Sequence, residues 1–170
     1  MNIKDRCLYY EMSTYKTFHQ NTINKMLHVF CIPIIMVTTL NFFSYLNIRL
    51  SNNKGNKLGS KIIHGFDEYN FDKIIALLFP VYYFINYSLE IGIYMSIFIL
   101  FLYKFAKIWR NNDIQWLKRS IIYFVAAWVI QFIGHAIEGN RPAFLTSVKM
   151  TIFEAPLYTL NYMVSFSNDI

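Results

Sequence analysis

The sequence predicts an all-α integral membrane protein, a helical bundle of four to five transmembrane helices. Of its 170 residues, 55% are hydrophobic, 19% are aromatic and only 15% are charged. Soluble domains carry about 25% charged residues, so this composition is typical of a chain surrounded by lipid. No strand-period alternation competes with a helical interpretation. Because the length is that of about one domain, we expect a single membrane domain over residues 1–170.

The predicted helices are apolar stretches, and a helix needs about 20 residues to cross the hydrocarbon core. The second and third stretches are short, and the "NYSLE" between them suits a turn near the headgroups, so we expect a helical hairpin there. In the first stretch, Pro33 and Asn41 would allow a break, which leaves the membrane topology open. In chain order, the stretches cover residues 27–48, 74–87, 89–105, 119–137 and 150–166.

A polar segment at about 49–73 separates the first two predicted helices. It is rich in Asn, Lys and Gly and has no amphipathic period, so it predicts an exposed, flexible loop. His64 lies in this segment, and we expect it to be a solvated loop histidine.

The charge distribution indicates which large partners the chain has. The net charge of +6 is spread over the predicted loops and is not gathered in one tract. This pattern fits the anionic headgroups of a lipid bilayer better than the groove of a nucleic acid. The sequence also lacks an RNA- or DNA-binding motif, so we expect the bilayer and no nucleic acid as partner. The residues do not specify an oligomeric state.

Two histidines stand at the start of the first predicted helix, in the stretch "TFHQNTINKMLHVFCIPII". His19 and His28 are nine residues apart, which puts them on opposite faces of one continuous helix at about 100° per residue. Asn21 and Thr22 are good N-cap residues, so a helix that begins between the histidines would let both imidazoles converge. Asn24 lies one turn before His28, where its amide could hold the imidazole tautomer or a substrate oxygen. Interfacial side chains that only extend toward headgroups would explain the same stretch.

A second polar cluster closes a later apolar helix, in "WVIQFIGHAIEGNRPAF". Gln131, His135, Glu138 and Arg141 follow at spacings of four, three and three, which puts them on one helical face. Ionisable groups at membrane depth normally face the bundle interior, so this face is a candidate functional site. A histidine with a carboxylate three residues on can bind a metal through both groups, or through the imidazole alone. Gly139 predicts the helix stop. A salt bridge between Glu138 and Arg141 is the alternative.

The blocks "HQNTINKMLHVFCIP" and "QFIGHAIEGNRPAF" resemble the paired signatures of the Mpo-type family, membrane 2-hydroxy fatty acid dioxygenases formerly catalogued as a domain of unknown function. The first signature is a His, an Asn, a second His and a Pro. The second is Gly-His, a nearby Glu and Arg/Lys-Pro-Ala/Ser. Thr22 stands where a Pro is common, and Cys31 where many members have Gly. The matching positions are His19, Asn24, His28, Pro33, Gly134, His135, Glu138, Pro142 and Ala143.

The resemblance implies an iron(II) enzyme that uses O₂ to cleave a long-chain 2-hydroxy fatty acid into the fatty acid one carbon shorter. In fungal members this is the α-oxidation step of phytosphingosine catabolism, carried out by a multi-pass protein of the endoplasmic reticulum membrane. On this resemblance, the expected metal ligands are His19, His28 and His135. The other expected roles are Glu138 as a fourth ligand or an adjacent base, Arg141 as carboxylate partner and Asn24 as orienting amide.

Two alternatives use the same residues differently. Zinc bound to these ligands would make the protein a membrane lipid hydrolase, because a zinc-bound water reaches a pKa of about 7. A lipid-binding membrane protein without enzymatic activity is the other alternative. Metal analysis distinguishes the first alternative from an iron enzyme, and substitution of His28 and His135 distinguishes the second.

Overall fold

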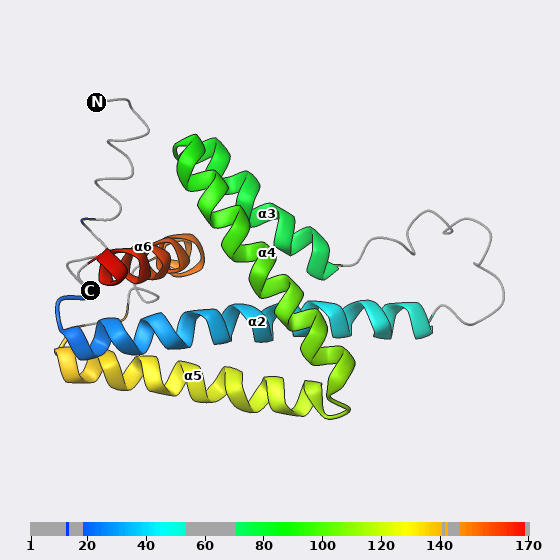
Figure 1. Ribbon diagram of the computed structural model, residues 1–170. Helices are drawn as coiled ribbons and strands as arrows, with labels where there is room; N and C mark the ends of the chain where they lie inside the picture. Colours follow the sequence, from blue (N-terminus) through cyan, green and yellow to red (C-terminus); the bar gives the residue numbers. More distant parts are fainter. Residues whose placement is uncertain (1–12, 14–18, 54–70, 141, 143–146, 169–170) are drawn as a thin grey trace.

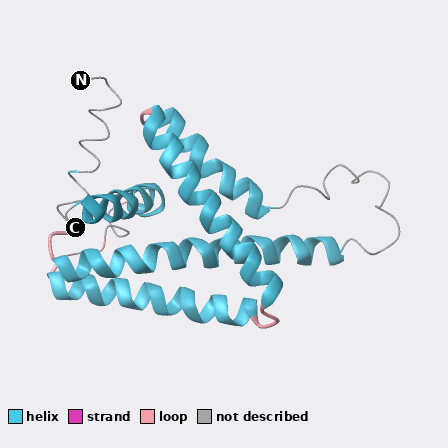
Figure 2. Ribbon diagram, viewed as in Figure 1, coloured by secondary structure: helices cyan, strands magenta, loops and turns pink. Residues whose placement is uncertain are grey.

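The structure is a computed structural model that describes residues 13, 19–53, 71–140, 142 and 147–168. Five α-helices contain nearly all of these residues, and a π-helical turn, Met150–Glu154, leads into the last of them. The described part of the chain contains no strand (Figure 2), so the predicted all-α class is confirmed. The helices are α2 (Thr22–Asn53), α3 (Phe71–Asn86), α4 (Leu89–Asn112), α5 (Trp116–Glu138) and α6 (Ala155–Asn168).

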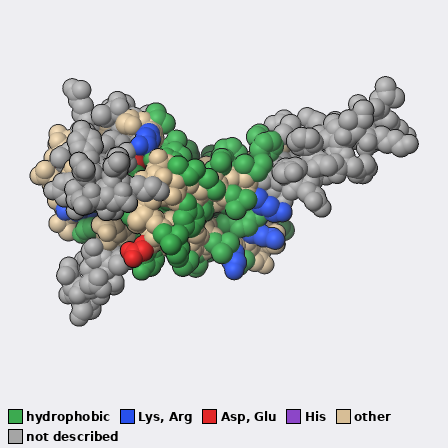
Figure 3. Space-filling model, turned by 90° about the horizontal axis from the view of Figure 1, so that it is seen from above, with side chains coloured by type: hydrophobic (Ala, Val, Ile, Leu, Met, Phe, Trp, Pro, Cys, Tyr) green, Lys and Arg blue, Asp and Glu red, His purple; other side chains and the backbone are tan. Residues whose placement is uncertain are grey.

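Three of the described helices are long and apolar enough to cross a membrane, namely Thr22–Leu46 of α2, α4 and α5. With 16 and 14 residues, α3 and α6 are shorter than a full span. Apolar side chains cover the middle of the face seen in Figure 3, as expected for a surface in contact with lipid. Large apolar side chains exposed on α4 and α5 include Ile97, Leu100, Phe101, Phe105, Ile122, Val125, Val129 and Phe132.

The start of α2 has the break that the sequence predicted. His19 precedes the helix, and α2 begins at Thr22. Asn21 caps it, because its Oδ1 accepts a hydrogen bond from the backbone N–H of Ile23 at 2.8 Å. Pro33, by contrast, does not interrupt α2, which continues through it to Asn53. The helices therefore occupy both ends of the predicted loop at 49–73, and the rest of it, residues 54–70 with His64, lies outside the described residues.

The helices α2 and α5 lie side by side and run in opposite directions (Figure 1), and they form the largest helix contact. The predicted hairpin is the pair α3 and α4, which crosses α2 at an angle. Close approach of α5 to α2 depends on Gly134, because a Cβ there would run into the side chain of Asn24 and come within 3.2 Å of Leu27 Cδ1. The start of α2 thus meets the end of α5.

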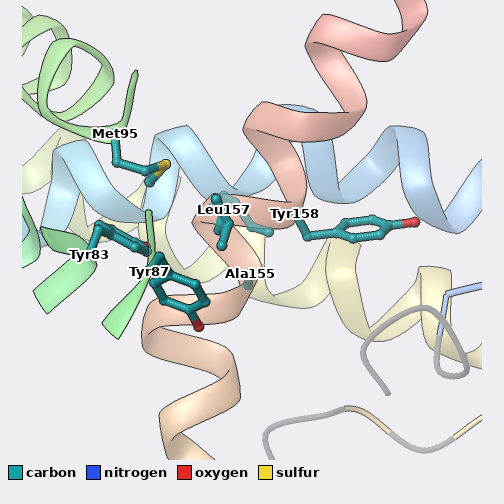
Figure 4. Close-up of a cluster of buried hydrophobic side chains, with 7 residues drawn as sticks. Tyr83, Tyr87, Met95, Ala155, Leu157 and Tyr158 are labelled. Carbon is teal, nitrogen blue, oxygen red and sulfur yellow. The ribbon is translucent and has the colours of Figure 1, made fainter. Parts of the chain in front are cut away.

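A cluster of buried side chains attaches α6 to the hairpin (Figure 4). Tyr87 donates its hydroxyl hydrogen to the buried carboxylate of Glu154, 2.7 Å from each oxygen. Tyr83 donates to the carbonyl oxygen of Phe153 at 2.6 Å. These bonds hold the turn that leads into α6 against the hairpin. The labelled members of the cluster are Tyr83, Tyr87, Met95, Ala155, Leu157 and Tyr158.

A second polar network joins four helices further along α2. Arg110 of α4 donates from Nη2 to Asp72 Oδ2 at 2.8 Å and from Nη1 to Asn41 Oδ1 at 2.9 Å. Asn41 Nδ2 donates to Ser120 Oγ of α5, also at 2.9 Å. The side chains of Arg110 and Asp72 are only 11% and 4% exposed, so this network is a buried and charged junction.

We expect Asp72→Ala to lower the free energy of unfolding by about 3 kcal/mol, because it leaves the buried Arg110 without its carboxylate. Arg119→Ala is the control, since it breaks an ion pair with Asp113 in which Arg119 is 52% exposed. That change should cost less than about 1 kcal/mol. Unfolding of the detergent-purified variants measures both, and equal small losses would contradict a structural role for the network.

Candidate metal centre

Three histidines from separate parts of the chain converge where α2 begins and α5 ends. One ring nitrogen of each lies within 4.8 Å of those of the other two. The ring centroids of His19 and His28 are 4.5 Å apart, and each lies 4.9 Å from that of His135. The three residues are between 1% and 4% exposed. The three histidines that were predicted from the sequence as metal ligands are therefore neighbours in a buried site.

Hydrogen bonding fixes which nitrogen of His28 is available to a ligand. Its Nδ1 lies 2.9 Å from the backbone carbonyl oxygen of Asn24. A carbonyl oxygen only accepts, so Nδ1 carries the hydrogen and Nε2 keeps a lone pair when the ring is neutral. This Nε2 points at the Nε2 of His19, 3.2 Å away.

The cluster fits a transition-metal ion. Nitrogen ligands about 2.1 Å from a shared ion lie about 3.0 to 3.4 Å apart at ordinary bond angles. The 3.2 Å between His19 Nε2 and His28 Nε2 falls in this range. His135 adds a buried Nδ1 that has no hydrogen-bond partner among the described residues, and a bound ion would satisfy such an atom. Imidazole ligands suit iron, zinc and copper, and three of them leave coordination positions open.

The carboxylate of Glu138 holds the two helices together at this site. Its Oε1 accepts hydrogen bonds from the backbone N–H groups of Gln20 and Asn21, and its Oε2 accepts one from Asn24 Nδ2. These donors lie at the start of α2, where backbone N–H groups lack helical partners and the helix dipole is positive. Both carboxylate oxygens of Glu138 therefore accept hydrogen bonds from the start of α2. The sequence had predicted Glu138 as either a fourth metal ligand or an adjacent base.

The remaining predicted residues lie around this junction. Asn24 is fully buried, and its side-chain amide binds Glu138 while its backbone carbonyl orients His28. Gly139 ends α5 in the left-handed conformation with φ of 76°, as its sequence position predicted. Arg141 lies outside the described residues.

An apolar cavity of about 440 Å³ extends from the histidines. Along α2 it runs from His28 to Phe43, fifteen residues or about 22 Å at about 1.5 Å per residue. Phe132 and Ile152 line it and are also 46% and 43% exposed, so the cavity reaches the apolar outer surface near the histidine end.

For two residues near the histidines the sequence predicted no specific role, although it put Gln131 on the candidate face of α5. Gln131 lines the cavity one turn before His135, and its buried Nε2 lacks a hydrogen-bond partner in the described part of the chain. An unpaired buried donor costs about 1–3 kcal/mol, which makes Gln131 a candidate for binding a ligand oxygen. Its spacing from His135 was the available signal. The ring of Tyr158 lies 5.8 Å from that of His19, and no sequence signal links α6 to this site.

Comparison with known proteins agrees with the family resemblance of the two sequence blocks. The family described as 2-hydroxy-palmitic acid dioxygenase Mpo1-like matches residues 7–166. The 2-hydroxy-palmitic acid dioxygenase MPO1 of Saccharomyces cerevisiae is 23% identical to this chain over 154 residues, which are 88% of this chain and 75% of the yeast protein. No solved structure matches. Since the family match spans all three clustered histidines and nearly the whole chain, this protein belongs to the Mpo1-like family.

Proposed function

We propose that this protein is an iron(II)-dependent dioxygenase that cleaves a long-chain 2-hydroxy fatty acid to the fatty acid one carbon shorter. The observation that carries the proposal is the cluster of three buried histidines at one end of a long apolar cavity. The yeast relative, which is named a 2-hydroxy-palmitic acid dioxygenase, supports oxygenase chemistry. As in the fungal members that the chain resembles, we infer a role in phytosphingosine catabolism at the endoplasmic reticulum membrane.

The donor set suits an anionic chelating substrate. His19, His28 and His135 are neutral as ligands, so they would leave the double positive charge of iron(II) uncompensated in a buried site. A 2-hydroxy acid offers a carboxylate and a hydroxyl that can bind side by side. When bound, iron(II) would supply the redox chemistry that dioxygen needs to react with the acid.

Side chains near the histidines would position the head of the acid. Gln131 has a donor in the cavity that no described residue engages, which suits the substrate oxygen nearest to it. For Arg141 we keep the role of carboxylate partner that the resemblance implies. Asn24 and Glu138 act indirectly, because they orient His28 and hold α5 against α2. Burial of the site would limit side reactions with water.

The cavity suits the alkyl tail. A saturated chain of sixteen carbons is about 19 Å long, since C–C bonds measure about 1.52 Å. The lining along α2 extends about 22 Å at about 1.5 Å per residue. Each methylene that leaves water contributes about 0.8 kcal/mol. The opening beside Phe132 and Ile152, on the lipid-facing surface, would admit an acid directly from the bilayer.

We expect the detergent-purified protein loaded with iron(II) to consume O₂ and convert 2-hydroxypalmitate into the odd-chain acid. Palmitate, which lacks the hydroxyl, should not be cleaved. The measurements are O₂ uptake and mass spectrometry of the acids. If hydrolysis of a lipid continues without O₂ and zinc copurifies, the protein is instead the zinc hydrolase considered from the sequence.

The same assay on histidine variants tests whether the clustered histidines bind the iron. His28→Ala and His135→Ala should lose bound iron and O₂ uptake together. His64→Ala is the matched control, since the fourth histidine of the chain falls in the predicted polar loop, and it should retain both. Unchanged metal content and activity in the first two variants would exclude the cluster as the catalytic centre.

Substitution of Glu138 tests whether it acts as a positioning residue or as a ligand. Glu138→Ala should weaken iron binding about 10- to 100-fold, the usual effect of removing a group that orients a ligand. Glu138→Gln should bind iron nearly as tightly as the wild type, because its amide can still accept from the start of α2. Asn24 can turn its amide to complement the glutamine, since its Oδ1 has no partner among the described side chains and backbone.

Metal titrations measure these affinities, and Glu90→Ala provides the control, because Glu90 is an exposed acid in the first turn of α4. Loss of iron from Glu138→Gln as complete as from Glu138→Ala would indicate direct coordination instead.

A further inference from the structure

The two ends of the cavity differ. The histidine end opens to the surface beside Phe132 and Ile152, which are 46% and 43% exposed. At the other end the cavity is lined by Leu40 of α2 and Leu102 of α4, each 4% exposed, and by Phe43, the last lining residue of α2. These two leucines belong to one core cluster, together with Val37 and Ala106. A tail that entered at the histidines would therefore meet packed side chains at its far end.

The polar network of Arg110, Asp72, Asn41 and Ser120 lies behind this end. On α5, Ser120 comes one turn before Phe124, which is the first lining residue of that helix. On α3, Asp72 likewise comes three residues before the first lining residue. On α5 and α3 the network therefore lies just beyond the cavity.

On α4, Arg110 follows Leu102 by about two turns, with Ala106 between them on the same face. On α2, Asn41 directly follows Leu40 in the sequence and bonds to both Arg110 and Ser120. Along α4 the order is thus cavity, leucine cluster and polar network, whereas on α2 Asn41 lies level with the far end of the cavity, between the lining residues Leu40 and Phe43.

This arrangement makes the end of the cavity resistant to displacement. Moving Leu40 or Leu102 outward would press apolar atoms against Arg110 and Asp72, whose ion pair has an N–O distance of 2.8 Å. Buried charged groups that lose their hydrogen bonds are costly, so the network opposes such a shift. An alkyl tail cannot extend the cavity simply by pushing the leucines apart.

We propose that Leu40 and Leu102, backed by the network, form a fixed floor that sets the maximum chain length of the acid. From His28 to Phe43, the last lining residue of α2, is fifteen residues, or about 22 Å along the helix. A saturated chain of sixteen carbons, about 19 Å long, fits within this depth. The identity of the ligand rests on the proposed function, whereas the floor is a property of the cavity itself.

The test is binding of saturated 2-hydroxy acids of increasing length, measured by displacement of a fluorescent fatty acid from the detergent-purified protein. Leu102→Ala deepens the cavity and should move the preferred length to longer acids, with a gain of about fourfold in affinity for each added methylene that becomes buried. Ala76→Leu fills space beside the same cluster and should move the preference to shorter acids. Leu100→Ala, on the same helix but 53% exposed, should leave the preference unchanged.

An unchanged length preference in Leu102→Ala and Ala76→Leu, with both proteins folded by gel filtration, would overturn the floor. If Leu102→Ala fails to fold, Ala76→Leu alone decides, since it adds volume and leaves no hole. Acids that bind with the expected length preferences but are not cleaved in the presence of iron(II) and O₂ would contradict the proposed function and support the floor. Failure of every acid to displace the probe from the wild type would overturn the floor as well.

Discussion

The carboxylate of Glu138 joins the end of α5 to the start of α2, and the positions of all three histidines depend on this junction. His19 precedes α2 and His28 lies about 1.7 turns inside it, so both depend on where α2 begins. His135 comes from α5, more than a hundred residues away. A negative side chain at the positive end of a helix is favourable, and here it also keeps two antiparallel helices aligned at the histidine cluster.

The α2–α5 pair has polar contacts at both ends and apolar surface between them. At one end Glu138 binds the start of α2, and toward the other Asn41 of α2 bonds to Ser120 of α5 and to Arg110 of α4. Between these contacts the cavity lining is apolar apart from the histidines, Gln131 and two threonines, Thr39 and Thr151. The same arrangement that stabilises the bundle thus gives the cavity a polar end with the three histidines and an apolar end beside the buried network.

Local signals in the sequence predicted much of the site. Cap residues indicated that α2 begins after His19, and helical spacing put Gln131, His135 and Glu138 on one face of α5. Contacts between distant segments could not be read in this way. The partners of Glu138 and the position of α6 arise from packing of separate helices. Hydropathy also suggested four to five spans, because α3 and α6 are apolar, although both are too short to cross as straight helices.

The most direct test of the central claim is X-ray absorption spectroscopy of the iron-loaded, detergent-purified protein, which counts the imidazole ligands of the metal. The structure predicts three, from His19, His28 and His135, with the remaining positions filled by light atoms that change when 2-hydroxypalmitate is added. A spectrum with fewer than three imidazoles, or one that is unaffected by the acid, would contradict this account.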